Sequence, residues 1–214
     1  MANVTYIGYH GTPTDKAEQI LLKYEFNKSN NEDDWLGSGI YFYDTLENAI
    51  CYNIRKYYNK NSKVPKFEQL VKNYKILKTC IKCDEKEIVD FNTFEQLYKF
   101  LWAWAQIYEI VKDDDEYKKL KFKDGYILNW LINESDYFNG CKVFLNIFNL
   151  DLTYHKKVKS IYNKKTRIGG YCFHQLYICV LDKKCISNIE LVSDEYEKEF
   201  DMINDITNNL LLEG

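Results

Sequence analysis

The chain has little proline, little glycine and no long apolar run. Only 2 of its 214 residues are proline and 9 are glycine, which excludes a collagen-like repeat and a proline- or glycine-rich linker. No apolar segment approaches the roughly 18 residues that a membrane-spanning helix needs, and the N-terminus does not resemble a secretory leader. We therefore expect no membrane association and a single cytoplasmic domain over residues 1–214.

An excess of one charge sign is missing as well. The 29 basic and 32 acidic residues leave a formal net charge of -3, and the isoelectric point is near 5.7. Such a chain is not expected to bind nucleic acid or anionic lipid non-specifically. Its overall charge does not exclude a local basic binding site.

Clusters of metal ligands are also absent from the sequence. It has 3 histidines, and its 7 cysteines are scattered and odd in number, as expected of reduced thiols in a cytoplasmic protein. Cys80 and Cys83 form one CxxC pair without a second close pair of ligands. No metal site is predicted.

The residue patterns predict a mixed α+β fold. Apolar alternation predicts strands at residues 3–9, 74–83, 144–148 and 171–181, and an aromatic strand at the end of segment 35–43. Polar pairs spaced three apart predict helix starts at Asp15 and Glu18, Asp44 and Glu47, and Thr93 and Gln96. The third helix is predicted to place these residues in the core: Phe94, Leu97, Leu101, Trp104, Ala105 and Tyr108.

Two motifs carry candidate chemistry. Tyr9-His10-Gly11-Thr12 stands where the first strand ends, and puts an imidazole beside backbone that a ligand can approach closely. Gly37-Ser38-Gly39-Ile40-Tyr41-Phe42 joins a glycine turn to an aromatic strand, and Tyr52 follows Tyr41 by eleven residues. Two rings facing each other across such a slot can hold a flat heterocycle, although a tyrosine-rich core would also explain them.

Together these motifs resemble the diphtheria-toxin-like and poly(ADP-ribose) polymerase-like ADP-ribosyltransferases over about the first 60 residues. The resemblance implies a split β-sheet core with flanking helices and NAD as the co-substrate. It implies that His10 hydrogen-bonds a ribose hydroxyl, that the Gly11 backbone holds the carboxamide, and that Tyr41 and Tyr52 stack on the nicotinamide. The implied NAD-binding set is His10, Gly11, Thr12, Gly39, Tyr41 and Tyr52.

The third catalytic position of that family is a glutamate on a late strand. The strand predicted here at 171–181 contains no acid, and alternation puts Gln175, Tyr177 and Cys179 on one face. Gln175 is the first candidate for this position and Tyr177 the second. Because Gln175 adds no negative charge opposite a developing cation, polymer elongation is not expected.

The segment 154–167 holds six basic residues and no acidic one. It is either a solvated loop or a basic patch at the mouth of the cleft that meets NAD phosphates or an anionic acceptor.

The function that follows from the resemblance is mono-ADP-ribosyl transfer to a protein or nucleic-acid acceptor, with His10, Tyr41 and Gln175 as catalytic residues. A toxin or defence effector of this type would also have an inhibitory partner protein. NAD glycohydrolysis and a catalytically silent NAD-binding module are the alternatives. Nicotinamide release distinguishes the two enzymes from the silent module, and label on a macromolecule distinguishes transfer from hydrolysis.

Overall fold

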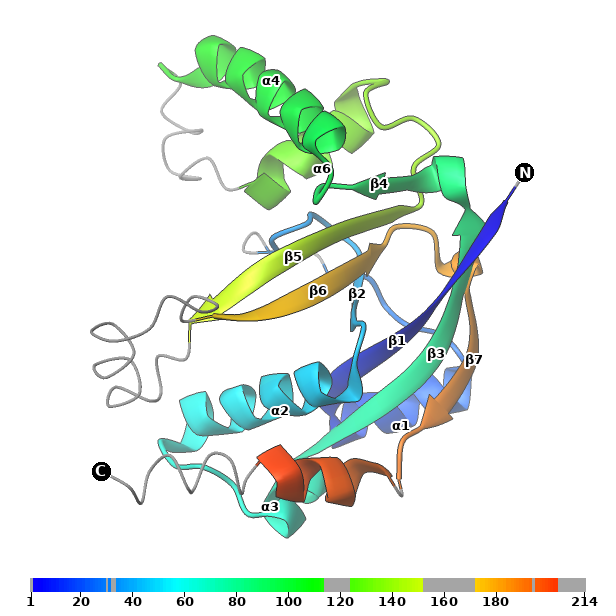
Figure 1. Cartoon of the computed structure of the whole chain (residues 1–214), viewed down its shortest axis with the longest axis vertical. Helices are drawn as coiled ribbons and strands as arrows, with labels where there is room; N and C mark the ends of the chain where they lie inside the picture. The colour runs from blue at the N-terminus through cyan, green and yellow to red at the C-terminus, as the bar shows by residue number, and fades with distance from the viewer. Residues whose placement is uncertain are drawn as a thin grey trace.

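The chain folds into an α+β structure built on one mixed sheet of seven strands (Figure 1). The computed structural model describes residues 2–29, 31, 34–113, 124–151, 172–193 and 195–203. Its strands are β1 (Asn3–Pro13), β2 (Ile40–Tyr43), β3 (Tyr74–Asp84), β4 (Ile88–Asp90), β5 (Val143–Asp151), β6 (Cys172–Val180) and β7 (Ile186–Leu191). Its helices are α1 (Thr14–Lys23), α2 (Leu46–Asn61), α3 (Phe67–Asn73), α4 (Phe94–Val111) and α6 (Asp124–Glu134), followed by a helix over residues 195–203.

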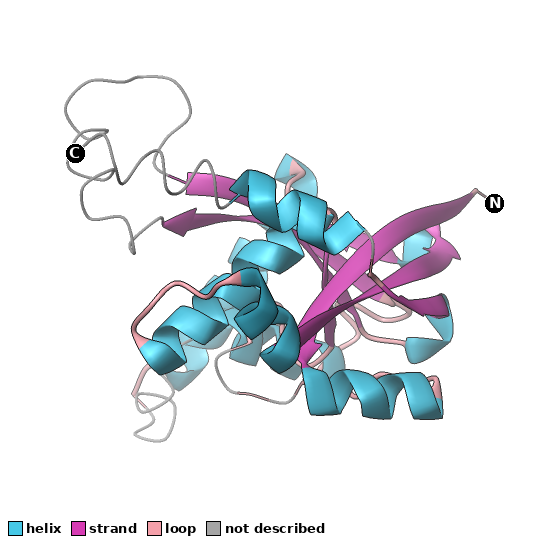
Figure 2. Cartoon of the chain, turned by 90° about the horizontal axis from the view of Figure 1, so that it is seen from below, coloured by secondary structure: helices cyan, strands magenta, loops and turns pink. Residues whose placement is uncertain are grey.

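Helices cover both faces of the sheet (Figure 2). Ala17 and Ile20 of α1 pack with Phe42 and Ile178 in one core cluster. The other helices share the opposite cluster, in which Tyr43 and Tyr177 are buried. Because successive strand residues point to opposite faces, β2 sends Ile40 and Phe42 to the first cluster and Tyr41 and Tyr43 to the second.

The sheet is opened in its middle. In the order β4-β5-β6-β2-β1-β3-β7, strand β1 pairs with β3 along its whole length, from Asn3 to Pro13. With β2 it forms a single register pair, Tyr9 with Tyr43, whereas β2 pairs with β6 at each of its four residues. The two halves of the sheet therefore separate beyond Tyr9, where the sequence continues with His10.

The predicted helix starts are correct in one case out of three. The Thr93 side chain accepts a hydrogen bond from the Gln96 backbone at 3.4 Å, as expected of an N-cap. The prediction for Asp15 is wrong, because Pro13 is the N-cap and its fixed backbone starts the helix without a side-chain cap. The prediction for Asp44 is wrong by one residue, since Thr45 caps α2 and accepts from the Asn48 backbone.

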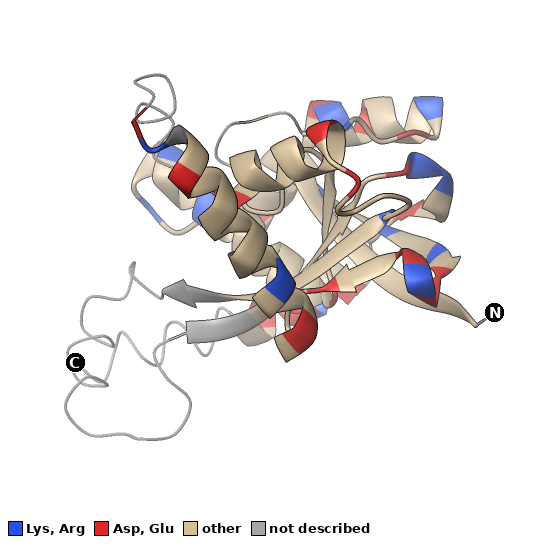
Figure 3. Cartoon of the chain, turned by 90° about the horizontal axis from the view of Figure 1, so that it is seen from above, with Lys and Arg blue, Asp and Glu red and all other residues tan. Residues whose placement is uncertain are grey.

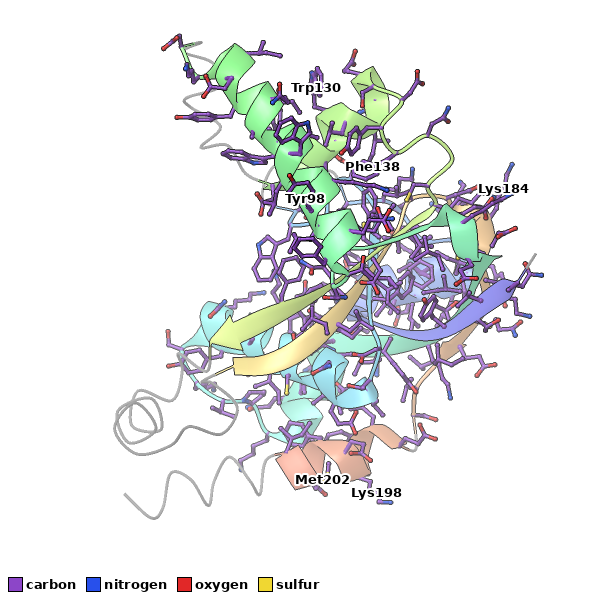
Figure 4. The ribbon with its side chains drawn as sticks, turned by 45° about the horizontal axis from the view of Figure 1, so that its top comes forward. Tyr98, Trp130, Phe138, Lys184, Lys198 and Met202 are labelled. Atoms are coloured by element: carbon purple, nitrogen blue, oxygen red, sulfur yellow. The ribbon has the colours of Figure 1, made fainter. Side chains whose placement is uncertain are left out.

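The predicted core face of α4 is mostly solvent-exposed. Phe94 is 83% exposed and Leu101 is 52% exposed, while Phe100, Ala103 and Ile107 are buried. Figure 4 labels Tyr98 of α4, which is also exposed, and Trp130 of the neighbouring α6. The apolar residues of this helix cover a broad arc beside a narrow polar side that holds Glu95, Lys99 and Gln106, so the helical period does not show which part of the arc is buried.

We expect Phe94→Ala to change the free energy of unfolding by less than about 0.5 kcal/mol, because the ring is exposed and alanine is the better helix former. Urea denaturation of the two proteins gives the comparison. A loss of 2 kcal/mol or more, as expected for a buried aromatic side chain, would place Phe94 in the core after all.

Candidate functional site

A cavity of about 650 Å³ lies where β1 and β2 separate, within the roughly 300–1,000 Å³ typical of small-molecule sites. It is lined by residues of β1, α1, the segment before β2, β2, α2, β3 and β6. All six residues of the implied NAD-binding set line it: His10, Gly11, Thr12, Gly39, Tyr41 and Tyr52. Tyr177 lines it too, whereas Gln175 does not.

His10 bridges the opening in the sheet. Its Nδ1 lies 2.7 Å from the Tyr41 carbonyl oxygen, and because a carbonyl only accepts, Nδ1 carries the proton. Burial lowers the pKa of His10, and the positive charge of Lys16 lowers it further, against the opposing effect of the Tyr41 carbonyl. His10 is therefore neutral at physiological pH, and Nε2 is a hydrogen-bond acceptor. The Phe26 and Phe42 rings pack against the imidazole, with centroids 5.2 Å and 5.7 Å away.

This burial predicts a pH dependence of stability. The folded pKa of His10 lies below its ordinary value of 6.5, so the unfolded chain takes up the proton first as the pH falls. The stability that depends on neutral His10 is complete above pH 6.5 and is lost as the pH drops from there through the folded pKa. Wild type should therefore lose more unfolding free energy between pH 7.5 and pH 5 than His10→Gln, measured by urea denaturation. Parallel profiles of the two proteins would show that His10 titrates as it does in the unfolded chain.

The Tyr41 hydroxyl both donates and accepts a hydrogen bond within the protein. It accepts a hydrogen bond from the Leu36 backbone N–H at 2.9 Å and donates one to the Gly37 carbonyl at 2.7 Å. Burial raises the pKa of Tyr41 well above its ordinary value, so the phenol stays neutral. Tyr41 thus offers its ring to the cavity, and its hydroxyl fixes the preceding turn.

The glycine turn before β2 is also held from α6. Gly37 has a φ of +75°, a left-handed conformation that favours glycine. A Cβ at this position would lie 2.6 Å from Asn129 Oδ1, the atom that accepts a hydrogen bond from the Ser38 backbone at 2.6 Å. The absence of a side chain at residue 37 therefore allows α6 to hold the turn that positions Tyr41.

Gly11 has a packing role in addition to the ligand role implied for it. A Cβ there would lie 2.6 Å from Asn53 Oδ1 and 3.1 Å from the Ala49 carbonyl, both on α2. Asn53 is buried, and its Oδ1 has no hydrogen-bond partner among the described residues. Gly11 thus lets α2 come close to β1 beside the cavity.

Aromatic rings form one wall of the cavity. The Tyr43 ring contacts Tyr52 at 5.6 Å and Tyr177 at 4.8 Å between centroids. Trp35 in turn lies 5.7 Å from Tyr177. The Arg55 guanidinium and the Lys56 ammonium approach the Tyr52 ring at 5.8 Å and 5.2 Å, so cations flank the aromatic wall.

Of the two candidates for the third position that the resemblance implies, only Tyr177 lines the cavity. Both lie on one face of β6, as predicted, and the Tyr177 hydroxyl donates to Gln175 Oε1 at 3.4 Å. Gln175, however, is only 1% exposed and lies outside the cavity lining. Tyr177 lines the cavity, and its hydroxyl also accepts a hydrogen bond from Tyr43 at 3.3 Å. The expectation that the Gln175 side chain lies in the cavity is therefore wrong, and Tyr177, the second candidate, lies there instead.

Three further predictions concern regions or groups that the cavity does not include. The basic segment 154–167 lies outside the described residues. Within the described part of the chain, no group of three or more histidine, cysteine or acidic residues is arranged to hold a metal ion. None of the described helices has the length and apolar character of a membrane span.

The chain was compared with protein families, curated proteins and solved structures. No family model matches. The chain is 24% identical over 197 residues to an uncharacterized protein of Methanocaldococcus jannaschii, MJ0359, in an alignment that covers 89% of this chain and 88% of that protein. No solved structure matches. The site's own geometry therefore carries the functional argument.

Most of the other lining residues were not predicted from the sequence, among them Trp35, Tyr43, Arg55 and Lys56. Strand alternation gives the signal for Tyr43, which lies two positions after Tyr41 on β2. Helical spacing gives it for Arg55 and Lys56, which lie one turn after Tyr52 on α2. No local pattern indicates Trp35.

Proposed function

We propose that this protein is an NAD-dependent mono-ADP-ribosyltransferase that acts on a macromolecular acceptor. The observation that supports this most is the separation of β1 and β2 beyond the Tyr9–Tyr43 pair, with neutral His10 in the gap and a cavity lined by tyrosine rings beside it. The opening agrees with the split sheet expected from the motif resemblance. Six of the seven cysteines are free thiols, namely Cys51, Cys80, Cys83, Cys141, Cys179 and Cys185, which supports a cytoplasmic setting.

The parts of the cavity suit the parts of NAD. Nε2 of His10 is free to accept a hydrogen bond from a ribose hydroxyl, since Nδ1 is bound to the Tyr41 carbonyl. The rings of Tyr41 and Tyr52 line the cavity and can contact the flat nicotinamide. We assign the Tyr177 hydroxyl, fixed between Tyr43 and Gln175, to the nicotinamide ribose.

In the proposed reaction the bond between ribose C1′ and the nicotinamide nitrogen breaks. Nicotinamide leaves with the electron pair as a neutral molecule, and cationic character develops on the ribose. An N–H or O–H group of the acceptor then bonds to C1′ and releases its proton to solvent. The protein contributes orientation and exclusion of water, both of which accelerate such a step without a covalent protein intermediate.

NAD titration calorimetry tests the assignment of His10. Loss of one hydrogen bond between neutral partners costs about 0.5 to 1.5 kcal/mol, so His10→Ala should weaken NAD binding by about 2- to 10-fold. Gln106→Ala, an exposed position on α4, serves as the control and should bind as wild type does. Equal affinity of folded His10→Ala and wild type would refute the assigned contact.

The fate of labelled ADP-ribose separates transfer from its alternatives. Label on a macromolecule indicates a transferase, and free ADP-ribose with released nicotinamide indicates a glycohydrolase. NAD binding without nicotinamide release indicates a silent module.

A further inference from the structure

The described lining of the cavity has more positive charge than NAD requires. Five cationic residues line it, Lys16, Lys23, Lys28, Arg55 and Lys56, against two acidic residues, Glu25 and Asp34. This excess is local, because the whole chain has a net charge of -3. In Figure 3 basic and acidic residues are interspersed over the visible elements.

Of these two acidic residues only Glu25 is paired outside the lining; Asp34 is held by Asn31, which also lines the cavity, and its charge offsets one of the five cations. The Glu25 carboxylate pairs with Lys183, which is not a lining residue. The Asp34 carboxylate accepts hydrogen bonds from Asn31, from the backbone N–H at 3.0 Å and from the side-chain amide at 3.5 Å. Among the described residues, none of the five lining cations forms an ion pair. Their remaining charge is therefore available to an anionic ligand.

These cations lie on two sides of the cavity. Lys16 and Lys23 are on α1, seven residues apart and thus on one helix face. Arg55 and Lys56 are on α2 beside the Tyr52 ring. The diphosphate of one NAD molecule brings two phosphate charges, partly offset by its cationic nicotinamide, which leaves a surplus of cations for a second anion.

Trp35 adds an aromatic surface at the same place. It lines the cavity, is 45% exposed, and packs on Phe148 at 4.6 Å and on Tyr177 at 5.7 Å between centroids. A half-exposed ring fixed from behind by other rings can stack on a planar group. Cationic groups that contact a phosphate backbone, combined with an aromatic stacking surface, are the features by which proteins bind single-stranded nucleic acid.

We infer, resting on the proposed function, that the acceptor is single-stranded nucleic acid. A base stacks on Trp35, and neighbouring phosphates contact Arg55 and Lys56. ADP-ribose passes from NAD to an N–H or O–H of the strand, with release of nicotinamide and a proton. A single strand suits the site better than a duplex, whose base faces are covered by their neighbours.

Fluorescence anisotropy with fluorescein-labelled 12-nucleotide RNA and DNA, without NAD, tests the binding surface. Wild type should bind either single strand more tightly than the matched duplex. Trp35→Ala should weaken single-strand binding by about 5- to 150-fold, which corresponds to about 1 to 3 kcal/mol per stacked base. The double variant Lys99→Gln/Lys112→Gln, in α4 and at its C-cap, removes two charges that do not line the cavity and should bind as wild type does.

The matched variant Arg55→Gln/Lys56→Gln should reduce the slope of log affinity against log salt by about 1.4, because each lost phosphate contact accounts for about 0.7 in a single strand. This variant changes no core residue, so it still tests the inference if Trp35→Ala does not fold. An unchanged slope, or an equal reduction in the α4 variant, would overturn the inference.

Incubation with radiolabelled NAD, oligonucleotide and a lysate separates the two proposals. Nicotinamide release with nuclease-sensitive label on the strand supports both. Nicotinamide release with protease-sensitive label, or without strand binding, overturns the nucleic-acid acceptor and leaves the enzyme proposal standing. No NAD binding and no nicotinamide release overturns the enzyme proposal, and with it the transfer to nucleic acid.

Discussion

Gln175→Glu should lower the free energy of unfolding by about 3 to 4 kcal/mol at pH 7.5. The Gln175 side chain is 1% exposed and has the Tyr177 hydroxyl as a hydrogen-bond partner. A carboxylate introduced there would be buried without a cation, and burial would raise its pKa. The loss of unfolding free energy is limited to about 4 kcal/mol. The introduced carboxyl group becomes protonated in the folded state when burial of its charge would cost more than protonation at this pH.

The penalty should depend on pH in a defined direction. Because the folded pKa is raised, the loss is absent below the unfolded value of about 4.3 and grows as the pH rises toward the folded pKa. Urea denaturation at pH 5 and pH 7.5 measures the difference. Gln175→Met, which has similar size and no charge, is the control and should show no such pH dependence. Parallel pH profiles of Gln175→Glu and Gln175→Met would mean that the introduced side chain reaches solvent in the cavity, as expected if residue 175 filled the third position implied by the resemblance.

Tyr177→Phe should slow nicotinamide release by about 100-fold with a smaller change in NAD affinity. The substitution keeps the ring contacts with Tyr43 and Trp35 and removes only the hydroxyl. An oriented polar group that acts mainly in the transition state affects the rate before it affects binding, and losses of roughly 100- to 1,000-fold are typical.

Tyr137→Phe provides the matched hydroxyl control. Tyr137 is exposed, and its hydroxyl donates to the Lys99 carbonyl on α4, so its removal should leave turnover unchanged. Equal turnover in Tyr177→Phe and wild type would remove Tyr177 from the third position. A parallel loss of affinity and rate would assign Tyr177 to ground-state binding instead.

The local parts of the site could be predicted from sequence. His10, Gly11 and Thr12 follow one another on β1, and Tyr41 follows the glycine turn on β2. Short-range spacing is sufficient for such motifs, because strand direction and turn chemistry depend on neighbouring residues. The α+β class and most long elements were correct for the same reason.

Contacts between distant segments could not be predicted. The tautomer of His10 depends on a carbonyl 31 residues away, and the turn before β2 depends on Asn129 of α6. Alternation on β6 assigns Gln175 and Tyr177 to one face, but coverage by neighbouring elements decides which of them reaches the cavity. Short elements such as β4 were missed, because three residues form a strand only through pairing with β5.

The buried face of helix α4 could not be predicted from the sequence for a different reason. Its apolar residues cover a broad arc beside a narrow polar side, so several faces within that arc satisfy the helical period. Phe100 is buried and Leu101 is exposed although both are large and apolar. Packing against the rest of the molecule, rather than periodicity, selects the buried face.

Nicotinamide release from NAD by the purified protein tests the central claim most directly. Chromatography of the reaction should show nicotinamide that accumulates with time and protein concentration, at a lower rate with His10→Ala. Nicotinamide at the level of a protein-free control, with a folded wild-type protein and saturating NAD, would contradict the assignment of this cavity to ADP-ribosyl transfer.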